Sequence, residues 1–241
     1  MRLRGGKKFR NKSSPDTFEV CQPVKVYSYV NFHTPVKYSY FSEGVDMHII
    51  SGASEGLPIG VHSKVATYRY KVFVEQLGWA LQTKGGEELD QFDRPDTVYV
   101  EAQDDEGHVS GCARLLPTTR PYLLGEVFPQ LLNGLLPPNS SDVWELSRFA
   151  AVDLNDPAST QGQFSSSVAI ELLQESITCA TELGAKRIIT VSPIGIERLL
   201  RRAGFHAHRA GPPMVIDGHP IFACWIELNQ SGRDSKASYE G

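Results

Sequence analysis

Three arginines stand where a charged side chain is usually unfavourable. Arg69 falls within an apolar helical pattern, and Arg114 and Arg148 fall inside runs of β-forming residues. A guanidinium in an apolar setting is costly unless a carboxylate, a phosphate or a ligand anion accepts hydrogen bonds from it. The three positions therefore predict either a set of structural salt bridges or a polar pocket for a zwitterionic ligand.

Carboxylates that could pair with these arginines occur in two places. Glu88, Asp90 and Asp93 lie in an acidic loop, and Glu145 lies in the same β-forming run as Arg148. Side chains alternate along a strand, so Glu145 and Arg148, three residues apart, should point to opposite faces. If both line one site, the strand must contain a β-bulge between them, and bulges are common beside active sites. We predict that bulge.

Length and composition limit the class of protein. The 241 residues, 41% hydrophobic and 22% charged, fit one sizeable folded domain rather than a coiled coil or a disordered chain. The net charge of −4 argues against general binding to nucleic acid. No apolar run approaches the roughly 18 residues that span a bilayer, and no apolar segment follows the basic N-terminus. We therefore expect no membrane association and a cytoplasmic protein.

The elements that must position the charged residues follow from hydrophobic periodicity and turn signals. The expected elements are a helix over about 61–77 ended by Gly78, a hairpin of strands 97–103 and 109–116 turned at Gly107, a strand at 143–150, a helix capped by Ser159 or Thr160 and ended by Gly184, a strand at 187–192, a helix at 194–203 ended by Gly204, and a strand at 220–228 after an Asp217–Gly218 turn. The segment 117–142 shows only a short apolar piece at 123–132. This order predicts one α/β domain with a mixed sheet and helices on its faces.

Both ends of the chain differ from the region between them. Residues 1–46 begin with a basic run and continue into a tyrosine-rich stretch without helical periodicity, so we expect a poorly ordered appendage. The alternative is a basic arm for nucleic acid or a membrane surface. The domain proper should then span 47–228, and 229–241 should form a polar tail.

The spacing of these residues resembles that of a known family. The runs Arg69-x-x-x-Phe73-x-x-Gln76-x-x-Trp79, Glu88-x-Asp90-x-Phe92-Asp93, Cys112-Ala-Arg114-Leu-Leu-Pro-Thr-Thr-Arg-Pro-Tyr-Leu-Leu124 and Val143-Trp-Glu145-Leu-Ser-Arg148-Phe149 resemble the acyl-homoserine-lactone synthases, the autoinducer synthases of bacterial quorum sensing. The resemblance covers about 47–228, and 1–46 have no counterpart in it. It implies a GNAT-like fold, a mixed and mainly antiparallel sheet flanked by helices.

The resemblance also implies a reaction. Enzymes of this family transfer an acyl chain from acyl carrier protein to the amine of S-adenosyl-L-methionine and then close the lactone with release of methylthioadenosine. By this resemblance the substrate site is lined by Arg69, Phe73, Trp79, Asp90, Asp93, Arg114 and Arg148. No cofactor or metal is expected, because S-adenosylmethionine is a substrate.

Individual roles within this reaction are expectations. We predict that Glu145 is the general base for the amine, acting beside Arg148; the alternative is that Glu145 holds an arginine in place. Thr190 falls where family members that accept 3-oxo chains often have threonine. The cationic residues Arg198, Arg201 and Arg202 form the predicted dock for the acidic carrier protein.

Other chemistry is less favoured by the sequence. Cys112 falls inside a predicted strand, so we expect an inert core thiol rather than an acylated nucleophile. His206, His208 and His219 lack the neighbours of a zinc site and are expected in loops or on the surface. The alternative enzyme is a GNAT-type N-acyltransferase that uses acyl-CoA, although the usual pyrophosphate loop is missing before residue 161. A non-catalytic protein that binds partners through the basic arm is the alternative from another class.

Overall fold

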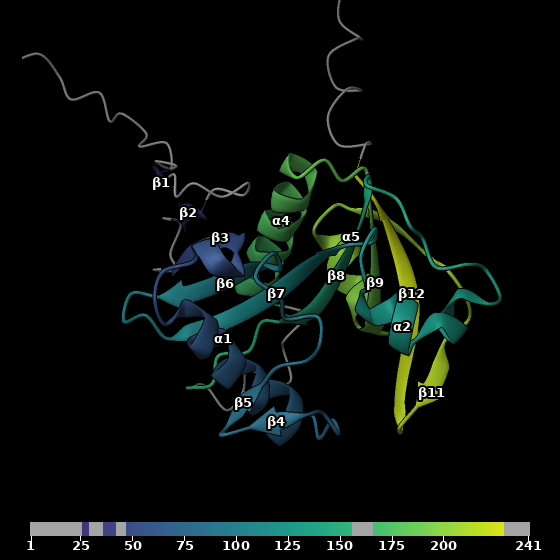
Figure 1. Cartoon of the computed structure of the whole chain (residues 1–241), viewed down its shortest axis with the longest axis horizontal. Helices are drawn as coiled ribbons and strands as arrows, with labels where there is room; N and C mark the ends of the chain where they lie inside the picture. The colour runs from purple at the N-terminus through teal and green to yellow at the C-terminus, as the bar shows by residue number, and fades with distance from the viewer. Residues whose placement is uncertain (1–25, 29–35, 42–46, 156–165, 229–241) are drawn as a thin grey trace, which may run out of the picture.

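A computed structural model describes residues 26–28, 36–41, 47–155 and 166–228 of the chain (Figure 1). Its strands are β1 (Val26–Ser28), β2 (Val36–Phe41), β3 (Met47–Ala53), β4 (Thr83–Lys84), β5 (Glu87–Glu88), β6 (Val98–Asp104), β7 (Val109–Pro117), β8 (Val143–Ala150), β9 (Arg187–Pro193), β10 (His206–Arg209), β11 (Met214–Ile216) and β12 (His219–Glu227). Its helices are η1 (Ser54–Gly56), α1 (Val61–Arg69), η2 (Tyr70–Gln76), α2 (Leu123–Val127), η3 (Pro129–Leu132), α4 (Ser167–Glu182) and α5 (Ile196–Arg202).

A single large sheet organises these elements. Its strands follow the order β1-β2-β3-β6-β7-β8-β9-β12-β10, with β11 also paired to β12, while β4 and β5 form a separate hairpin. Within the described residues every pairing in the large sheet is antiparallel except that of β8 with β9. The predicted fold class, a mixed and mainly antiparallel GNAT-like sheet with helices on its faces, is confirmed.

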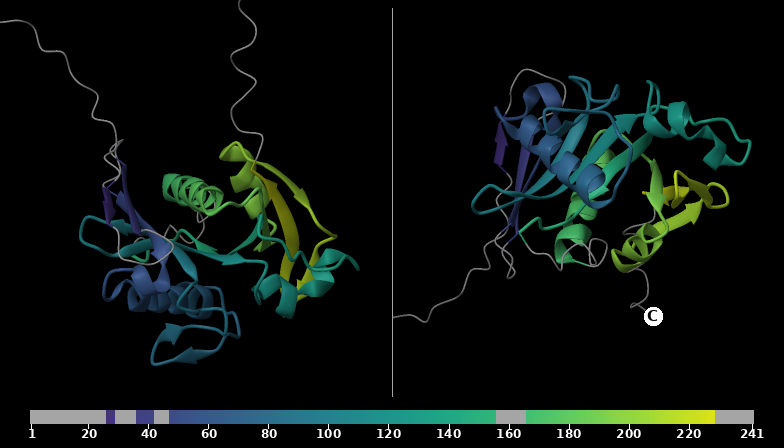
Figure 2. Two further views of the ribbon diagram at one scale, coloured as in Figure 1. Left: turned by 45° about the horizontal axis from the view of Figure 1, so that its top comes forward. Right: turned by 90° about the horizontal axis from the view of Figure 1, so that it is seen from below.

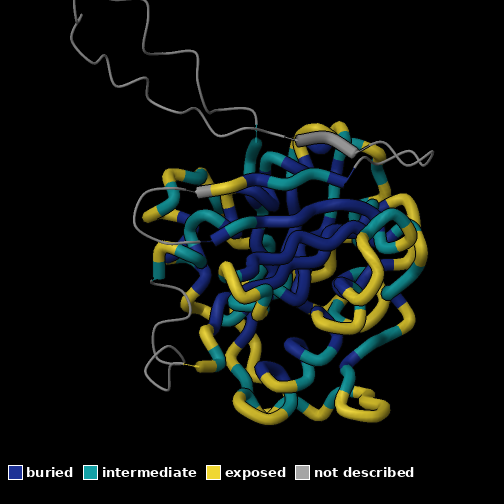
Figure 3. The backbone as a smooth tube through the Cα atoms, turned by 90° about the vertical axis from the view of Figure 1, so that its left-hand side faces the viewer, coloured by how far each residue is buried: buried dark blue, intermediate teal, exposed yellow. Residues whose placement is uncertain are grey.

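The helices cover both faces of this sheet. Helix α4 lies against one face and α1 lies against the other, as the left view of Figure 2 shows. Leu172, Leu173 and Ala180 of α4 pack into a core with the apolar side chains of the central strands, and Val65 and Phe73 belong to a second core on the α1 side. The central strands are accordingly the most deeply buried part of the chain (Figure 3).

Most predicted elements are present near their expected bounds. The hairpin of β6 and β7 turns at Gly107, whose φ of +77° suits a residue without a Cβ. The helix predicted over 61–77 is present, but its second half, η2, is a π-helix. A π-helical segment carries one extra residue per turn, which hydrophobic periodicity does not distinguish from an α-helix, and such segments are frequent at functional sites.

Two boundaries differ from the sequence-based expectation. Helix α4 begins at Ser167, and its N-cap is Ser166, whose hydroxyl accepts a hydrogen bond from the Ala169 N–H at 3.1 Å. Ser159 and Thr160, the predicted caps, lie outside the described residues. The apolar piece at 123–132 forms two short helices, α2 and η3. Cap residues are plentiful in this region, so sequence alone could not select the true one.

The prediction of a poorly ordered appendage at 1–46 is wrong for two segments. Strands β1 and β2 extend the sheet beyond β3, with Lys37 opposite Ser51 in the ladder. Val36 is 3% exposed and belongs to the core on the α1 side. In β2 the apolar Val36, Tyr38 and Tyr40 alternate with Lys37 and Ser39, a strand pattern that a search for helical periodicity does not detect. Strand β1 has only three residues, too few for a pattern to show.

None of the helices in the described part of the chain has the length and hydrophobicity of a transmembrane span.

Candidate active site

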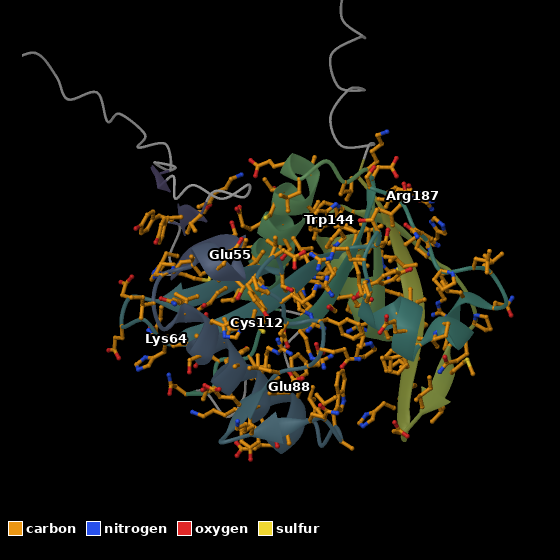
Figure 4. The ribbon with its side chains drawn as sticks, viewed as in Figure 1. Glu55, Lys64, Glu88, Cys112, Trp144 and Arg187 are labelled. Atoms are coloured by element: carbon orange, nitrogen blue, oxygen red, sulfur yellow. The ribbon has the colours of Figure 1, made fainter. Side chains whose placement is uncertain are left out.

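The three arginines that the sequence analysis identified meet on the side of the sheet that α1 covers. Arg69 ends α1, Arg114 lies in β7 and Arg148 lies in β8, and the side chains are 1%, 0% and 5% exposed. The acidic partners come from β5 and the loop after it. Glu88, labelled in Figure 4, lies on the side of the sheet that α1 covers. Helix, strand and loop thus meet at one buried point.

Guanidinium and carboxylate groups alternate there in a closed ring. Arg69 donates to Glu88 at 2.6 Å and to Asp93 at 2.7 and 3.1 Å. Arg114 donates to Asp93 at 2.9 Å and to Asp90 at 2.7 and 3.1 Å. Arg148 completes the ring by donating to Asp90 at 3.0 Å and to Glu88 at 2.9 Å. We call these six groups the ion ring. Each of them contacts two groups of opposite charge.

The electrostatics of the ion ring keep its acids ionised. Burial alone would raise the pKa of Asp93, but the charges of Arg69 and Arg114 outweigh burial and lower it. The pKa of Glu88 is lowered in the same way, because Arg69 and Arg148 overcome the cost of burial. The Tyr99 hydroxyl also donates to Asp93 at 2.5 Å. Three positive and three negative charges therefore balance without a bound ion.

A β-bulge aims Arg148 at this ring. In the β7–β8 ladder Arg114 pairs with Ser147 and Cys112 pairs with Ala150, so Ala113 faces both Arg148 and Phe149. Arg148 has a φ of +51°, unusual for a residue with a Cβ. The predicted bulge is therefore present, but it is at Arg148 itself; the prediction that it lies between Glu145 and Arg148 is wrong, because the ladder is regular from Trp144 to Ser147.

A cavity of about 320 Å³ opens beside the ion ring where two strands part. Strands β8 and β9 pair from Val143 and Arg187 only as far as Leu146 and Thr190. Beyond that point residues 147–149 and 190–193 line the cavity from opposite sides. The single parallel pairing of the described sheet thus ends in the space that a ligand would occupy.

The cavity is polar at one end and mainly apolar elsewhere. Glu88, Asp90 and Arg148 present the ion ring to it, and Thr190 and Ser192 add hydroxyl groups that lie 2.9 Å apart. The apolar walls come from α2, β9, α5 and the β11–β12 hairpin, and include Leu123, Val127, Phe128, Val191, Ile196 and Ile221. Such a cavity suits a ligand with a charged head and an aliphatic tail.

Aromatic side chains form a further wall. Phe73 stacks on Trp79 with ring centroids 5.2 Å apart, and the Arg148 guanidinium lies 5.8 Å from the Phe73 centroid. His219 contacts Trp79 edge-on at 5.8 Å. The expectation that His219 is an ordinary loop or surface residue is wrong, because it starts β12, is half-buried and lines the cavity. A π-face next to a guanidinium also suits a cationic or heteroaromatic ligand.

Arg69, Asp93 and Arg114 belong to the ion ring but are absent from the described lining of the cavity. Glu145 belongs neither to the ring nor to this lining, and its side chain is fully buried. Its oxygens accept hydrogen bonds from the backbone N–H groups of Leu123 and Leu124 at 3.0 and 2.6 Å, which fixes the start of α2 to β8. Burial raises its pKa, against the Leu124 N–H and the charge of Arg114. The structure therefore shows an anchor for α2, and the base role stays a prediction.

The remaining predicted residues divide between the cavity and the surface. Thr190 lies on the cavity wall, whereas Arg198, Arg201 and Arg202 are exposed on α5, whose Ile196 lines the cavity. Sequence inspection missed Tyr99 and Ser147, which bond to Asp93 and Arg114. Strand alternation puts Ser147 on the same face as Glu145, a signal that could have identified it. The described residues include no cluster of His, Cys, Asp or Glu able to hold a metal ion.

Comparison with known proteins gives consistent matches. Residues 60–235 match the family described as autoinducer synthase. The acyl-homoserine-lactone synthase of Acinetobacter nosocomialis is 60% identical over 183 residues, which are 76% of this chain and 100% of that protein.

Solved structures agree with this match. The crystal structure of TofI in a ternary complex with an inhibitor and MTA is 46% identical, with a TM-score of 0.64, and the match covers 75% of this chain and 91% of TofI. The structure of BjaI, a CoA-dependent acyl-homoserine lactone synthase, with SAM and isopentyl-CoA is 26% identical, with a TM-score of 0.66, covering 78% and 85%.

Proposed function

The chain belongs to the autoinducer synthase family, the acyl-homoserine-lactone synthases, and we propose that it acylates the amine of S-adenosyl-L-methionine and then closes the homoserine lactone. The observation that carries this proposal is the cavity between the parted strands β8 and β9, which has the ion ring at one end and apolar walls around the rest. MTA bound to TofI, and SAM bound to BjaI, support the choice of substrate.

The side of the ion ring that lines the cavity suits the amino-acid head of S-adenosylmethionine. Arg148 and Asp90 are neighbours in the ring and both line the cavity, whereas Arg69, Arg114 and Asp93 stand behind them. An α-carboxylate can accept from Arg148 while the α-ammonium donates to Asp90, so the zwitterion replaces one ion pair with two. The buried half of the ring keeps Arg148 and Asp90 at fixed positions while this exchange occurs.

The acyl chain then occupies the apolar part of the cavity. Residues 147–149 of β8 are not paired with β9, and we propose that backbone N–H groups on this side of the strand bind the thioester oxygen as negative charge develops on it. Thr190 and Ser192 offer hydroxyl groups to an oxygen on the third carbon of the chain. The aliphatic remainder packs against α2, α5 and β12.

The reaction balances without a cofactor. The amine nitrogen forms the amide bond to the thioester carbon, the carbon–sulfur bond breaks, and the carrier thiol leaves. Of the two protons that the ammonium loses, one ends on the carrier thiol and the other goes to the base, for which Glu145 with its raised pKa remains the predicted group. The carboxylate next attacks the γ-carbon, and the electrons of the broken carbon–sulfur bond stay on the sulfur of methylthioadenosine.

We propose acyl carrier protein as the donor, with acyl-CoA as the alternative that BjaI illustrates. Arg198, Arg201 and Arg202 are exposed on α5 and suit an acidic partner. The nearby Arg209 is already engaged, because it donates to Glu197 at 2.6 and 2.7 Å. The cationic face of α5 stands beside the apolar end of the cavity, where a carrier arm would enter.

An assay of product formation tests the activity. The purified protein is incubated with S-adenosylmethionine and panels of acyl carrier protein and acyl-CoA thioesters, and lactone and methylthioadenosine are measured by mass spectrometry. We expect both products in equal amounts from at least one acyl carrier thioester. Turnover with acyl-CoA alone would overturn the donor, and absence of lactone from every donor would overturn the activity.

Charge reversal on α5 tests the dock. We expect R201E/R202E to raise KM for the acyl carrier substrate about tenfold or more while KM for S-adenosylmethionine changes less than twofold. The matched control is Arg120→Glu, which reverses an exposed arginine that pairs with Asp96 away from α5. Equal effects of the two variants would reject the α5 dock.

A further inference from the structure

Cys112 lies directly behind the bulge that aims Arg148. It is in the middle of β7, is 1% exposed, and is labelled near the centre of the sheet in Figure 4. It is absent from the described lining of the cavity, so an acyl group cannot reach its sulfur without rearrangement of the fold. The reaction proposed above leaves this thiol without a role.

The thiol has a specific partner in the bulge. Cys112 Sγ donates to the backbone carbonyl of Arg148 at 3.3 Å. In a regular ladder that carbonyl would be paired within the sheet, but a bulge leaves the backbone of its extra residue unpaired. A buried carbonyl without a donor is unfavourable, and the thiol supplies the donor from the neighbouring strand.

The protonation state of Cys112 is consistent with a donor. Burial raises the pKa of its thiol to about 12, so the S–H is retained at neutral pH. The positive φ of Arg148 costs backbone energy and persists only where neighbouring contacts hold it. Glu88 and Asp90 hold the guanidinium of Arg148, and Cys112 holds its backbone carbonyl.

We infer that Cys112 is a positioning residue for Arg148: its thiol holds the bulge in the form that turns the guanidinium toward Asp90 and the cavity. This inference rests on the proposed function, in which Arg148 binds the carboxylate of S-adenosylmethionine. Loss of the donor should therefore weaken the amino-acid end of the site and leave the acyl end nearly unchanged.

Three variants test this role. Cys112→Ala removes the donor, and Cys112→Ser keeps a donor on a shorter bond. Cys179→Ala is the matched control, because Cys179 is a buried free thiol on α4, across the sheet from the ion ring. We expect C112A to raise KM for S-adenosylmethionine roughly tenfold with KM for the acyl donor within twofold, C112S to recover most of the loss, and C179A to behave like wild type.

Other outcomes would reject the inference. It fails if C112A and C179A have the same KM for S-adenosylmethionine, or if C112A raises KM for both substrates in proportion to its loss of stability. It also fails if C112S has as high a KM for S-adenosylmethionine as C112A. A crystal structure of C112A in which Arg148 keeps its positive φ and both ion pairs also rejects it, whatever the activity. Failure of wild-type protein to form lactone would count against the proposed function instead, since the crystal structure of C112A tests the bulge independently of turnover.

Discussion

At the scale of single residues, the protein contains two kinds of buried carboxylate. Those of the ion ring are each held by two guanidinium groups, and their pKa values are lowered where a shift is resolved, as at Glu88 and Asp93. Glu101, in β6, contacts no guanidinium group: burial raises its pKa against the Gln103 hydrogen bond and the charge of Lys64, and one of its oxygens has no hydrogen-bond partner among the described residues. The first kind stabilises the fold at neutral pH, whereas the second opposes it.

Asp93 is the member of the ring with the most partners. Replacing it with asparagine leaves Arg69 and Arg114 buried with less compensating charge, so we expect D93N to lower the free energy of unfolding by about 3–5 kcal/mol. Because the pKa of Asp93 is lowered, its contribution is present at neutral pH and is lost on acidification. The measurement is denaturant unfolding at pH 7. Asp96→Asn removes an exposed pair with Arg120 and should cost less than about 1 kcal/mol; equal losses would contradict the buried ring.

Glu101 predicts the opposite pH dependence. Burial raises its pKa from 4.5 to about 7, so between these values the folded protein holds a proton that the unfolded chain releases. Stability therefore falls as pH rises through this range, by on the order of 3 kcal/mol. We expect Glu101→Gln to be more stable than wild type at pH 8 and similar to it at pH 5, measured by chemical unfolding. A constant difference across this range, or the same pattern in the exposed control Glu75→Gln, would contradict the assignment.

At the scale of elements, strand β8 does most to build the site. Its first half pairs with β9 and contains Glu145, which accepts a hydrogen bond from the start of α2. Its second half does not pair with β9, so the cavity lies between the two strands there, and the bulge directs Arg148 toward the ion ring. The π-helical η2 also contributes to the site, because it places Phe73 beside Arg148 of the ion ring, and Trp79 stacks on Phe73. Both irregular elements give up regular hydrogen bonding to direct side chains into one space.

Glu145 offers a test of whether β8 contributes a base or an anchor. An amide at this position turns an NH₂ group toward the N–H groups of Leu123 and Leu124, so we expect E145Q to lower kcat/KM about 100-fold and also to lower the free energy of unfolding by about 1–3 kcal/mol. The two quantities are measured on the same preparation. Loss of kcat with unchanged stability and KM would show a base without an anchoring role, and lost stability with normal kcat would leave only the anchor.

At the scale of the whole molecule, strands β1 and β2 extend the sheet outside residues 60–235, the part of the chain that matches the family. The match to the A. nosocomialis synthase spans 183 of 241 residues, which leaves 58 without a counterpart in it. In this chain β2 pairs with β3 from Met47 to Ser51, and Lys37 forms an ion pair with Glu182 of α4. The extension thus covers an edge strand and links it to the helix behind, far from the cavity.

Removal of residues 1–46 should therefore affect stability more than activity. Deletion exposes the apolar contacts of Val36 and the hydrogen-bonding edge of β3, and we expect a loss of about 2 kcal/mol or more together with a tendency to self-associate. Thermal unfolding and light scattering measure the two effects. Deletion of 1–25, which keeps β1 and β2, is the control. Equal behaviour of both deletions would show that β2 adds nothing to the fold.

Local sequence was sufficient for the features that depend on short-range chemistry. The β6–β7 hairpin follows from alternating β-formers around Gly107, the helix ends at Gly184 and Gly204 follow from glycine, and the need for partners at Arg69, Arg114 and Arg148 follows from the cost of burying a guanidinium. The family was recognisable from the spacing of the same residues.

Only the tertiary structure decided that three arginines and three acids close into one ring, that the bulge is at Arg148, that Glu145 binds α2 and that His219 contacts Trp79. These relations join segments distant in sequence, and their geometry depends on where strands pair and part, which no local pattern records.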